Sequence, residues 1–121
     1  MRLMGAVSGV PRFVLDDVEV AGGSIPAGTV VFLSVASANR DETAFENPLG
    51  FDITATREGH LTFGGGPHRC LGVHLARAEM EEAFAILLRR LPNLRFGGEP
   101  TWRTGTGIAG PTRLPLRFDA T

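Results

Sequence analysis

The chain has 121 residues, of which 43% are hydrophobic, and its formal net charge at pH 7 is -1. That net charge gives no positive field to attract nucleic acid, so we expect no nucleic-acid partner. No run approaches the roughly 20 apolar residues that span a bilayer, so we expect no membrane association. A single cysteine excludes an internal disulfide framework and favours a reducing compartment, which predicts a cytoplasmic location.

The first third of the chain predicts short strands joined by tight turns. Residues 1–11 show no period and are expected to be irregular. Residues 13–20 alternate imperfectly between apolar and acidic side chains and run into Gly22-Gly23, which predicts a hairpin. The segment Pro26-Ala27-Gly28 predicts a second turn, and the continuous β-branched run over 29–35 then predicts a buried strand.

The middle of the chain is expected to be mostly irregular. The triplet Asn39-Arg40-Asp41 predicts a capped, solvated turn that begins a short helical segment, and Pro48 is expected to stop that segment. We assign the triplet no chemistry. Residues 48–60 have no hydrophobic period and predict an irregular meander.

One long helix is predicted over about 71–91. Its apolar residues recur at the spacing of a buried stripe, which we expect to be core: Val73, Ala76, Met80, Ala83, Phe84, Leu87 and Leu91. Residues 94–118 predict edge strands and a hairpin, with turns at Gly105, Gly107 and Gly110. The pattern as a whole predicts an α+β fold of short hairpins around one helix.

The stretch from Phe63 to Gly72, Phe-Gly-Gly-Gly-Pro-His-Arg-Cys-Leu-Gly, holds the only cysteine. Its glycines and proline permit tight turns in which the backbone can lie against a large ligand. The predicted helix begins just after Cys70, so unpaired N–H groups at the helix start would favour a negatively charged sulfur.

Several chemistries are compatible with a lone cysteine here. It is commonly a small buried hydrophobe. A phosphatase-type nucleophile would need an arginine six residues later, but Ala76 stands there and Arg77 follows it. A zinc site stays open, although the usual paired ligand spacing is missing; it would draw on Cys70, His74, His68 and His60.

The order Phe63-x-x-Gly66-x-x-x-Cys70-x-Gly72, with His68 two residues before the cysteine, closely resembles the cysteine-ligand loop of the cytochrome P450 monooxygenases, in particular the bacterial soluble kind. The resemblance implies that Cys70 is the proximal iron ligand of haem b (iron protoporphyrin IX), where its electron donation favours O–O cleavage. It also implies that Phe63 packs beside the sulfur, and that the amides of Leu71 and Gly72 donate to it.

Further roles follow from the same resemblance. Arg12 and His68 would reach the haem propionates, and the Gly107-Ile108-Ala109 tip would reach the substrate side. Arg2 matches the arginine of the family's Glu-x-x-Arg motif, whose glutamate would lie before Met1. Gly50 stands where the family commonly has an arginine that completes this ion network. The remaining implied haem contacts are Thr62, Gly64 and Ala76.

The resemblance extends from Arg2 to Phe118. It implies that residues 1–121 are the carboxyl-terminal haem-thiolate portion of a P450 domain, without the helices that build the substrate pocket and activate dioxygen. We therefore expect an enzyme family that inserts one oxygen atom of O2 into a small organic substrate, using a ferredoxin-type or flavin-type electron donor. The isolated chain is expected to be inactive and to expose apolar surface. The alternatives are a non-catalytic haem- or metal-binding module, and a truncated product that binds no cofactor.

Overall fold

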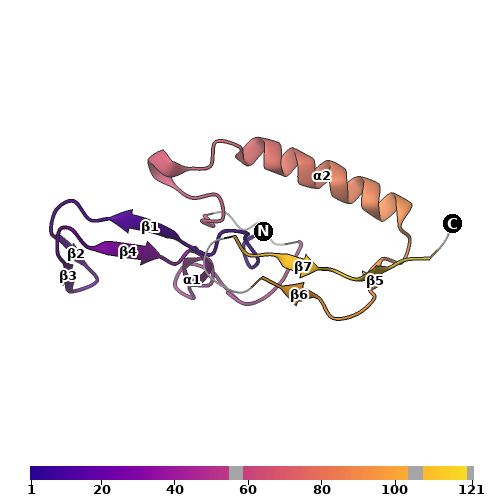
Figure 1. Ribbon diagram of the computed structural model, residues 1–121, viewed down its shortest axis with the longest axis horizontal. Coiled ribbons are helices and arrows are strands. Elements are labelled where there is room, and N and C mark those ends of the chain that lie inside the picture. The colour runs from indigo at the N-terminus through magenta and orange to yellow at the C-terminus, as the bar shows by residue number, and fades with distance from the viewer. Residues whose placement is uncertain (55–58, 104–107, 120–121) are drawn as a thin grey trace. The chain divides into compact units, whose positions relative to one another are not determined.

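The computed structural model describes residues 1–54, 59–103 and 108–119. The chain forms two compact units: the first comprises Met1–Thr62 with Gly105–Ala109, and the second comprises Phe63–Thr104 with Gly110–Thr121. The described elements, drawn in Figure 1, are β1 (Val10–Phe13), β2 (Val18–Val20), β3 (Gly23–Ile25), β4 (Val30–Leu33), α1 (Val35–Ala38), the 3-10 turn η1 (Gly66–His68), α2 (Val73–Arg90), β5 (Arg95–Phe96), β6 (Thr101–Trp102), β7 (Pro111–Arg113) and β8 (Leu116–Arg117).

In the first unit, β1 pairs with β4 and β2 pairs with β3, both antiparallel. The β2–β3 pair confirms a hairpin here, but its first strand covers only Val18–Val20 of the predicted 13–20. Its turn lies one residue earlier than predicted, at Ala21 and Gly22, which both have positive φ. The predicted turn at Pro26 is also present. There the Thr29 amide donates to the Pro26 carbonyl at 3.3 Å, and Gly28 has a φ of 82°, as a type II turn requires at its third residue.

The prediction that residues 29–35 form a buried strand is wrong. Strand β4 covers Val30–Leu33, and its side chains are mostly exposed, with Val30 at 67%. Among the described strands, β4 pairs only with β1, and a two-stranded ribbon buries a face only where a second layer packs on it. Val35, which begins α1, is the one buried apolar side chain of this run.

The short helix precedes Asn39, whereas the sequence predicted it after this residue. Helix α1 begins at Val35 because Ser34 caps it, with the Ser34 hydroxyl accepting from the Ser37 amide at 3.2 Å, and Asn39 ends it. Asp41 caps a turn instead, accepting from the amide and the hydroxyl of Thr43. Residues 48–54, 59 and 60 contain no helix or strand, as predicted for the meander.

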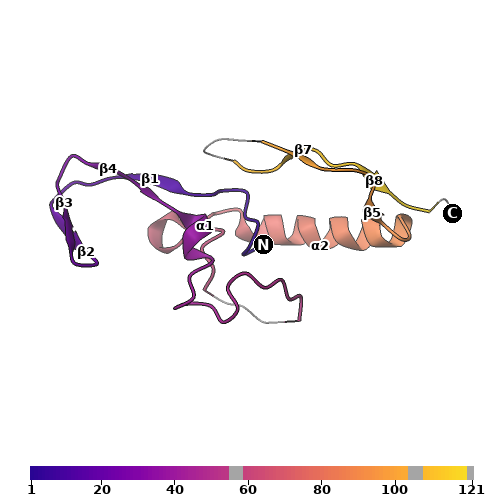
Figure 2. The same ribbon diagram turned by 90° about the horizontal axis from the view of Figure 1, so that it is seen from below.

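In the second unit, α2 runs beside the strand pairs β5–β8 and β6–β7 in both views (Figures 1 and 2). Helix α2 confirms the predicted long helix, beginning two residues later and ending one residue earlier than 71–91. The β6–β7 pair confirms a hairpin in the last third of the chain; Gly105 and Gly107 of its predicted turn lie outside the described residues. The α+β class is therefore confirmed, with short hairpins and one long helix.

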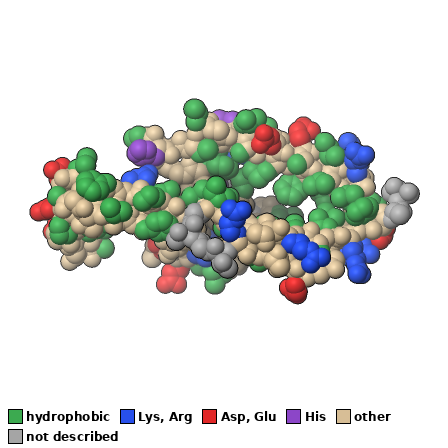
Figure 3. Space-filling view, viewed as in Figure 1, with side chains coloured by type: hydrophobic (Ala, Val, Ile, Leu, Met, Phe, Trp, Pro, Cys, Tyr) green, Lys and Arg blue, Asp and Glu red, His purple; other side chains and the backbone are tan. Residues whose placement is uncertain are grey.

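The predicted core stripe of α2 is buried only at Val73, which is the only buried residue of the helix. Phe84, another residue of the stripe, is 60% exposed. Figure 3 shows hydrophobic side chains at the surface along this part of the molecule. Residues 83–88 are all apolar, so this segment of the helix has no polar face. A helix that is apolar on every side is normally buried by neighbouring elements. The expected exposure of apolar surface is thereby confirmed. In the described part of the chain, no helix combines the length and apolarity that crossing a membrane requires.

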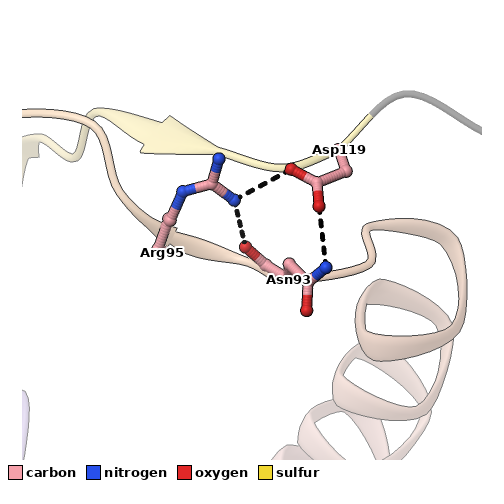
Figure 4. Close-up of polar contacts among 3 residues, drawn as sticks. All are labelled: Asn93, Arg95 and Asp119. Carbon is pink, nitrogen blue, oxygen red and sulfur yellow. Dashed lines mark hydrogen bonds and ion pairs between the residues drawn. The ribbon is translucent and has the colours of Figure 1, made fainter.

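A polar cluster joins the end of α2 to the last strand (Figure 4). The Asp119 carboxylate accepts from the Asn93 side-chain amide at 2.7 Å and from the Arg95 guanidinium at 3.1 Å. Arg95 also donates to the Asn93 carbonyl at 2.8 Å, and the Asp119 amide donates to the carbonyl of Pro92. This cluster extends the β5–β8 pairing beyond its two residue pairs.

The stability that this cluster contributes should depend on pH. Hydrogen bonds from Asn93 and Arg95 hold the pKa of Asp119 below its ordinary value of 3.8. A lowered carboxyl pKa gives a stabilising contribution that is fully present above 3.8 and is lost as the pH falls through the lower folded-state value. An NMR titration of the Asp119 carboxyl should therefore show a pKa below that of a model peptide. Asn93→Ala should move it back upwards, and an unchanged value in that variant would contradict this account.

Candidate functional site

The loop from Phe63 to Gly72 is closed by backbone hydrogen bonds. The Cys70 amide donates to the Phe63 carbonyl at 2.7 Å, and within this closure the Arg69 amide donates to the Gly66 carbonyl at 3.1 Å. Gly64 and Gly66 have φ values of 71° and 56°, where side chains are strained. A Cβ at Gly64 would also lie 3.0 Å from a carbonyl oxygen. The predicted tight turns ahead of the cysteine are confirmed.

Cys70 is a free, exposed thiol at the end of this loop. Helix α2 begins three residues later, capped by no side chain at Gly72 and with no acidic residue in its first turn. The first N–H groups of a helix have no acceptor within it. Among the described residues, none accepts a hydrogen bond from the amides of Leu71 or Gly72. The sulfur is thus followed in sequence by available donors, which suit an anionic ligand.

The start of α2 also offers apolar and accessible surface. Leu71 is 99% exposed, and Leu75 is largely exposed. A Cβ placed at Gly72 would meet no atom within 4 Å, so the backbone there is open to a ligand. Ala76, whose amide bonds the Gly72 carbonyl at 2.9 Å, adds a small side chain one turn later. An exposed thiol beside exposed apolar side chains and open backbone fits haem, a flat and largely apolar group whose iron a cysteine thiolate could bind.

The predicted site residues divide between the two units. The second unit contains most of them: Phe63, Gly64, His68, Cys70, Leu71, Gly72 and Ala76. Arg12 lies on β1 of the first unit, where its guanidinium donates to the Pro11 carbonyl at 2.8 Å. Thr62 ends the first unit, and its hydroxyl accepts from the Asn39 side chain at 3.1 Å. The haem roles of all these residues stay predictions.

Two alternative interpretations of the cysteine find no support in the structure. Cys70 is exposed, so it is not a small buried hydrophobe in this chain. Across residues 1–54, 59–103 and 108–119, no three His, Cys, Asp or Glu side chains are grouped so that they could hold a metal ion. A zinc centre built from Cys70 and the histidines is therefore not favoured.

The first unit has a buried polar centre that the sequence did not predict. Arg2 is 7% exposed, and its guanidinium donates to the carbonyls of Asn39 at 2.6 Å, Pro48 at 2.7 Å and Gly50 at 3.4 Å, while lying 4.7 Å from the centroid of the Phe45 ring. Asn39 is 1% exposed, so the predicted solvated turn is wrong at this residue. No local pattern distinguishes a buried asparagine from a solvated one here, because its partners are 22 to 37 residues away.

Gly50 stands where the resemblance implied an arginine, and the Asn47 side chain occupies the space that a Cβ at this position would take. A Cβ there would lie 2.2 Å from the Asn47 side-chain nitrogen. The Gly50 carbonyl instead accepts from Arg2. The backbone of this segment thus supplies acceptors to Arg2 without an arginine at position 50.

Comparison with known proteins gives one consistent family. The family model described as Cytochrome P450 matches residues 1–96. Luteothin monooxygenase from Streptomyces thioluteus is 50% identical over 110 residues, which cover 90% of this chain and 27% of that protein. Cytochrome P450-terp from a Pseudomonas species is 42% identical over 118 residues, covering 98% of this chain and 28% of that protein.

Solved structures agree with the sequence matches. Cytochrome P450 CYP109Q5 from Chondromyces apiculatus superposes with a TM-score of 0.94 at 38% identity, covering 99% of this chain and 31% of that one. The P450 monooxygenase TamI, solved with tirandamycin C bound, gives a TM-score of 0.93 at 38% identity over 98% of this chain. The chain therefore spans less than a third of the length of these relatives, and its arrangement is part of their fold.

Proposed function

Because this chain belongs to the cytochrome P450 family, whose cofactor is haem, we propose that Cys70 would hold the haem iron as a thiolate ligand in an oxygen-dependent monooxygenase. The observation that carries the proposal is the exposed Cys70 sulfur at the end of a closed glycine loop, directly ahead of an uncapped helix. We further propose haem b as the form of the cofactor, and residues 1–121 as the carboxyl-terminal haem-thiolate portion of the domain.

The chain's own residues would hold and tune this group. The amides of Leu71 and Gly72 would donate to the sulfur and limit its electron donation, and Phe63 would shield it from water. Gly64, Thr62 and Ala76 would allow close approach of the porphyrin. Arg12 and His68 would bind the propionates through charge-assisted hydrogen bonds.

When bound, the haem would supply dioxygen chemistry, in which the substrate, O2, two electrons and two protons give the oxygenated substrate and water. Relatives named as a monooxygenase and as a hydroxylase/epoxidase support a small organic substrate. The electrons require a donor, for which we propose a ferredoxin-type or flavin-type protein.

A cytoplasmic location is supported by the single unpaired cysteine. Because the chain spans about 30% of its relatives, we propose that alone it is a poor or inactive catalyst.

The test is a carbon monoxide difference spectrum. The chain is reconstituted with haem, reduced and exposed to carbon monoxide, and we expect the strongly red-shifted Soret band of a thiolate ligand. An imidazole-type band, or zinc found by elemental analysis, would support a non-catalytic metal-binding module instead. No spectral change would support a product that binds no cofactor.

A further inference from the structure

Asn39 is the most deeply buried side chain among the described residues, and its side-chain amide is fully engaged. Its oxygen accepts from the Leu61 amide at 2.6 Å. Its nitrogen donates to the Thr62 hydroxyl at 3.1 Å and to the Arg2 carbonyl at 3.3 Å. A hydrogen bond left unmade at a buried site is costly. These three hydrogen bonds therefore hold the Leu61 amide, the Thr62 hydroxyl and the Arg2 carbonyl in fixed positions.

The two residues that Asn39 holds, Leu61 and Thr62, come directly before the cysteine loop. Residues 59–65 contain no helix or strand, so no ladder of backbone hydrogen bonds fixes this part of the chain. The next residue, Phe63, provides the carbonyl that accepts from the Cys70 amide at 2.7 Å. The hydrogen bonds of Asn39 thus reach Leu61 and Thr62, and the peptide chain joins Thr62 to Phe63, whose carbonyl closes the loop at Cys70.

We propose that Asn39 is a positioning residue for the Cys70 thiolate. It acts through Leu61 and Thr62 by fixing the backbone at which the loop begins, and does not itself touch haem. The consequence for haem rests on the proposed function, whereas the consequence for the loop does not. Asn39 follows α1, whose own start is fixed by the Ser34 cap, so the anchor belongs to an ordered element.

The experiment uses the full chain without haem and measures amide hydrogen exchange. Thr62→Val removes the hydroxyl that accepts from Asn39 at 3.1 Å and donates to the Met1 carbonyl at 3.5 Å, and it leaves the Arg2 guanidinium contacts in place. We expect it to raise the exchange rate of the Cys70 amide by about tenfold, the effect of one lost hydrogen bond. The Val14 amide, which donates to the Thr29 carbonyl just beyond the β1–β4 pairing, should be unchanged. Asn39→Ala should raise exchange at both Leu61 and Cys70. Asn39→Asp keeps the acceptor oxygen and should restore protection at Leu61.

Asn93→Ala is the matched control, because it removes an asparagine amide that bonds Asp119 and no residue before the cysteine loop. If Asn39→Ala unfolds the whole first unit, the exchange rate of the Val14 amide rises as well. In that case the exchange rate of the Cys70 amide in Thr62→Val tests the proposal. The proposal is overturned if Thr62→Val leaves the Cys70 amide as protected as in the unaltered chain, or if the control changes it equally.

With haem added, Asn39→Ala, which alters no proposed haem contact, should lower the share of thiolate-type carbonyl spectrum in proportion to the exchange at Cys70. If Cys70 proves not to be the iron ligand, the proposed function fails, and the exchange data still decide whether Asn39 positions the loop.

Discussion

Replacing Cys70 with serine is expected to abolish the red-shifted ferrous carbonyl band of the haem-loaded chain. A hydroxyl stays protonated where a thiol gives up its proton, so serine offers iron a weak neutral ligand in place of a thiolate. The chain has no second cysteine to substitute for it. The red-shifted band should fall to background in the carbon monoxide difference spectrum, with any remaining pigment absorbing like an imidazole or unligated haem.

The matched controls are the two histidines of the second unit. His74 lies in the first turn of α2 and His68 at the end of η1, and both are exposed. Either would be the iron ligand if the chain were an imidazole-type haem module. Replacing each with alanine should leave the red-shifted band at its position, with His68→Ala lowering only the affinity for haem. A band that survives in Cys70→Ser, or disappears in His74→Ala, would refute thiolate ligation.

Features set by adjacent residues were predictable from the sequence. The loop before Cys70, the hairpin of β2 and β3, the turn at Gly28 and helix α2 all follow from glycine placement and local periodicity. These elements depend on backbone conformations that neighbouring residues alone favour or forbid. The resemblance to the cysteine-ligand loop belongs to the same class, because its fixed positions fall within ten residues.

Burial was not predictable, because it depends on what lies across from a residue. Apolar residues of β4 and α2 were predicted to be core, and the structure exposes Val30 and Phe84. An apolar pattern shows which side chains favour burial. It does not show whether other residues of this chain bury them. The error at Asn39 is the reverse: a polar residue typical of a solvated turn is buried by partners distant in sequence. The first unit is consequently centred on polar contacts, and its stability should respond most to changes there.

Replacing Arg2 with methionine should destabilise the first unit by at least about 1–3 kcal/mol, the cost of leaving one buried hydrogen-bonding group unpaired. Arg2 donates to three carbonyls that belong to Asn39, Pro48 and Gly50, so its loss leaves acceptors from two distant segments unpaired. It also removes a cation from the Phe45 ring. The single tryptophan lies in the second unit, so its fluorescence is a poor reporter here. Amide exchange at Val14 and Asn39, both hydrogen-bonded in the first unit, is the suitable measurement.

Arg2→Lys separates charge from shape in this prediction. Lysine keeps the positive charge, but its compact ammonium group cannot reproduce the planar guanidinium that reaches several carbonyls at once. We therefore expect it to recover only part of the lost protection. Arg113→Met is the control, because Arg113 is exposed on β7 and makes no polar side-chain contact with another described residue. Equal losses of protection in Arg2→Met and Arg113→Met, or full recovery with lysine, would show that the carbonyl contacts of Arg2 do not hold the first unit together.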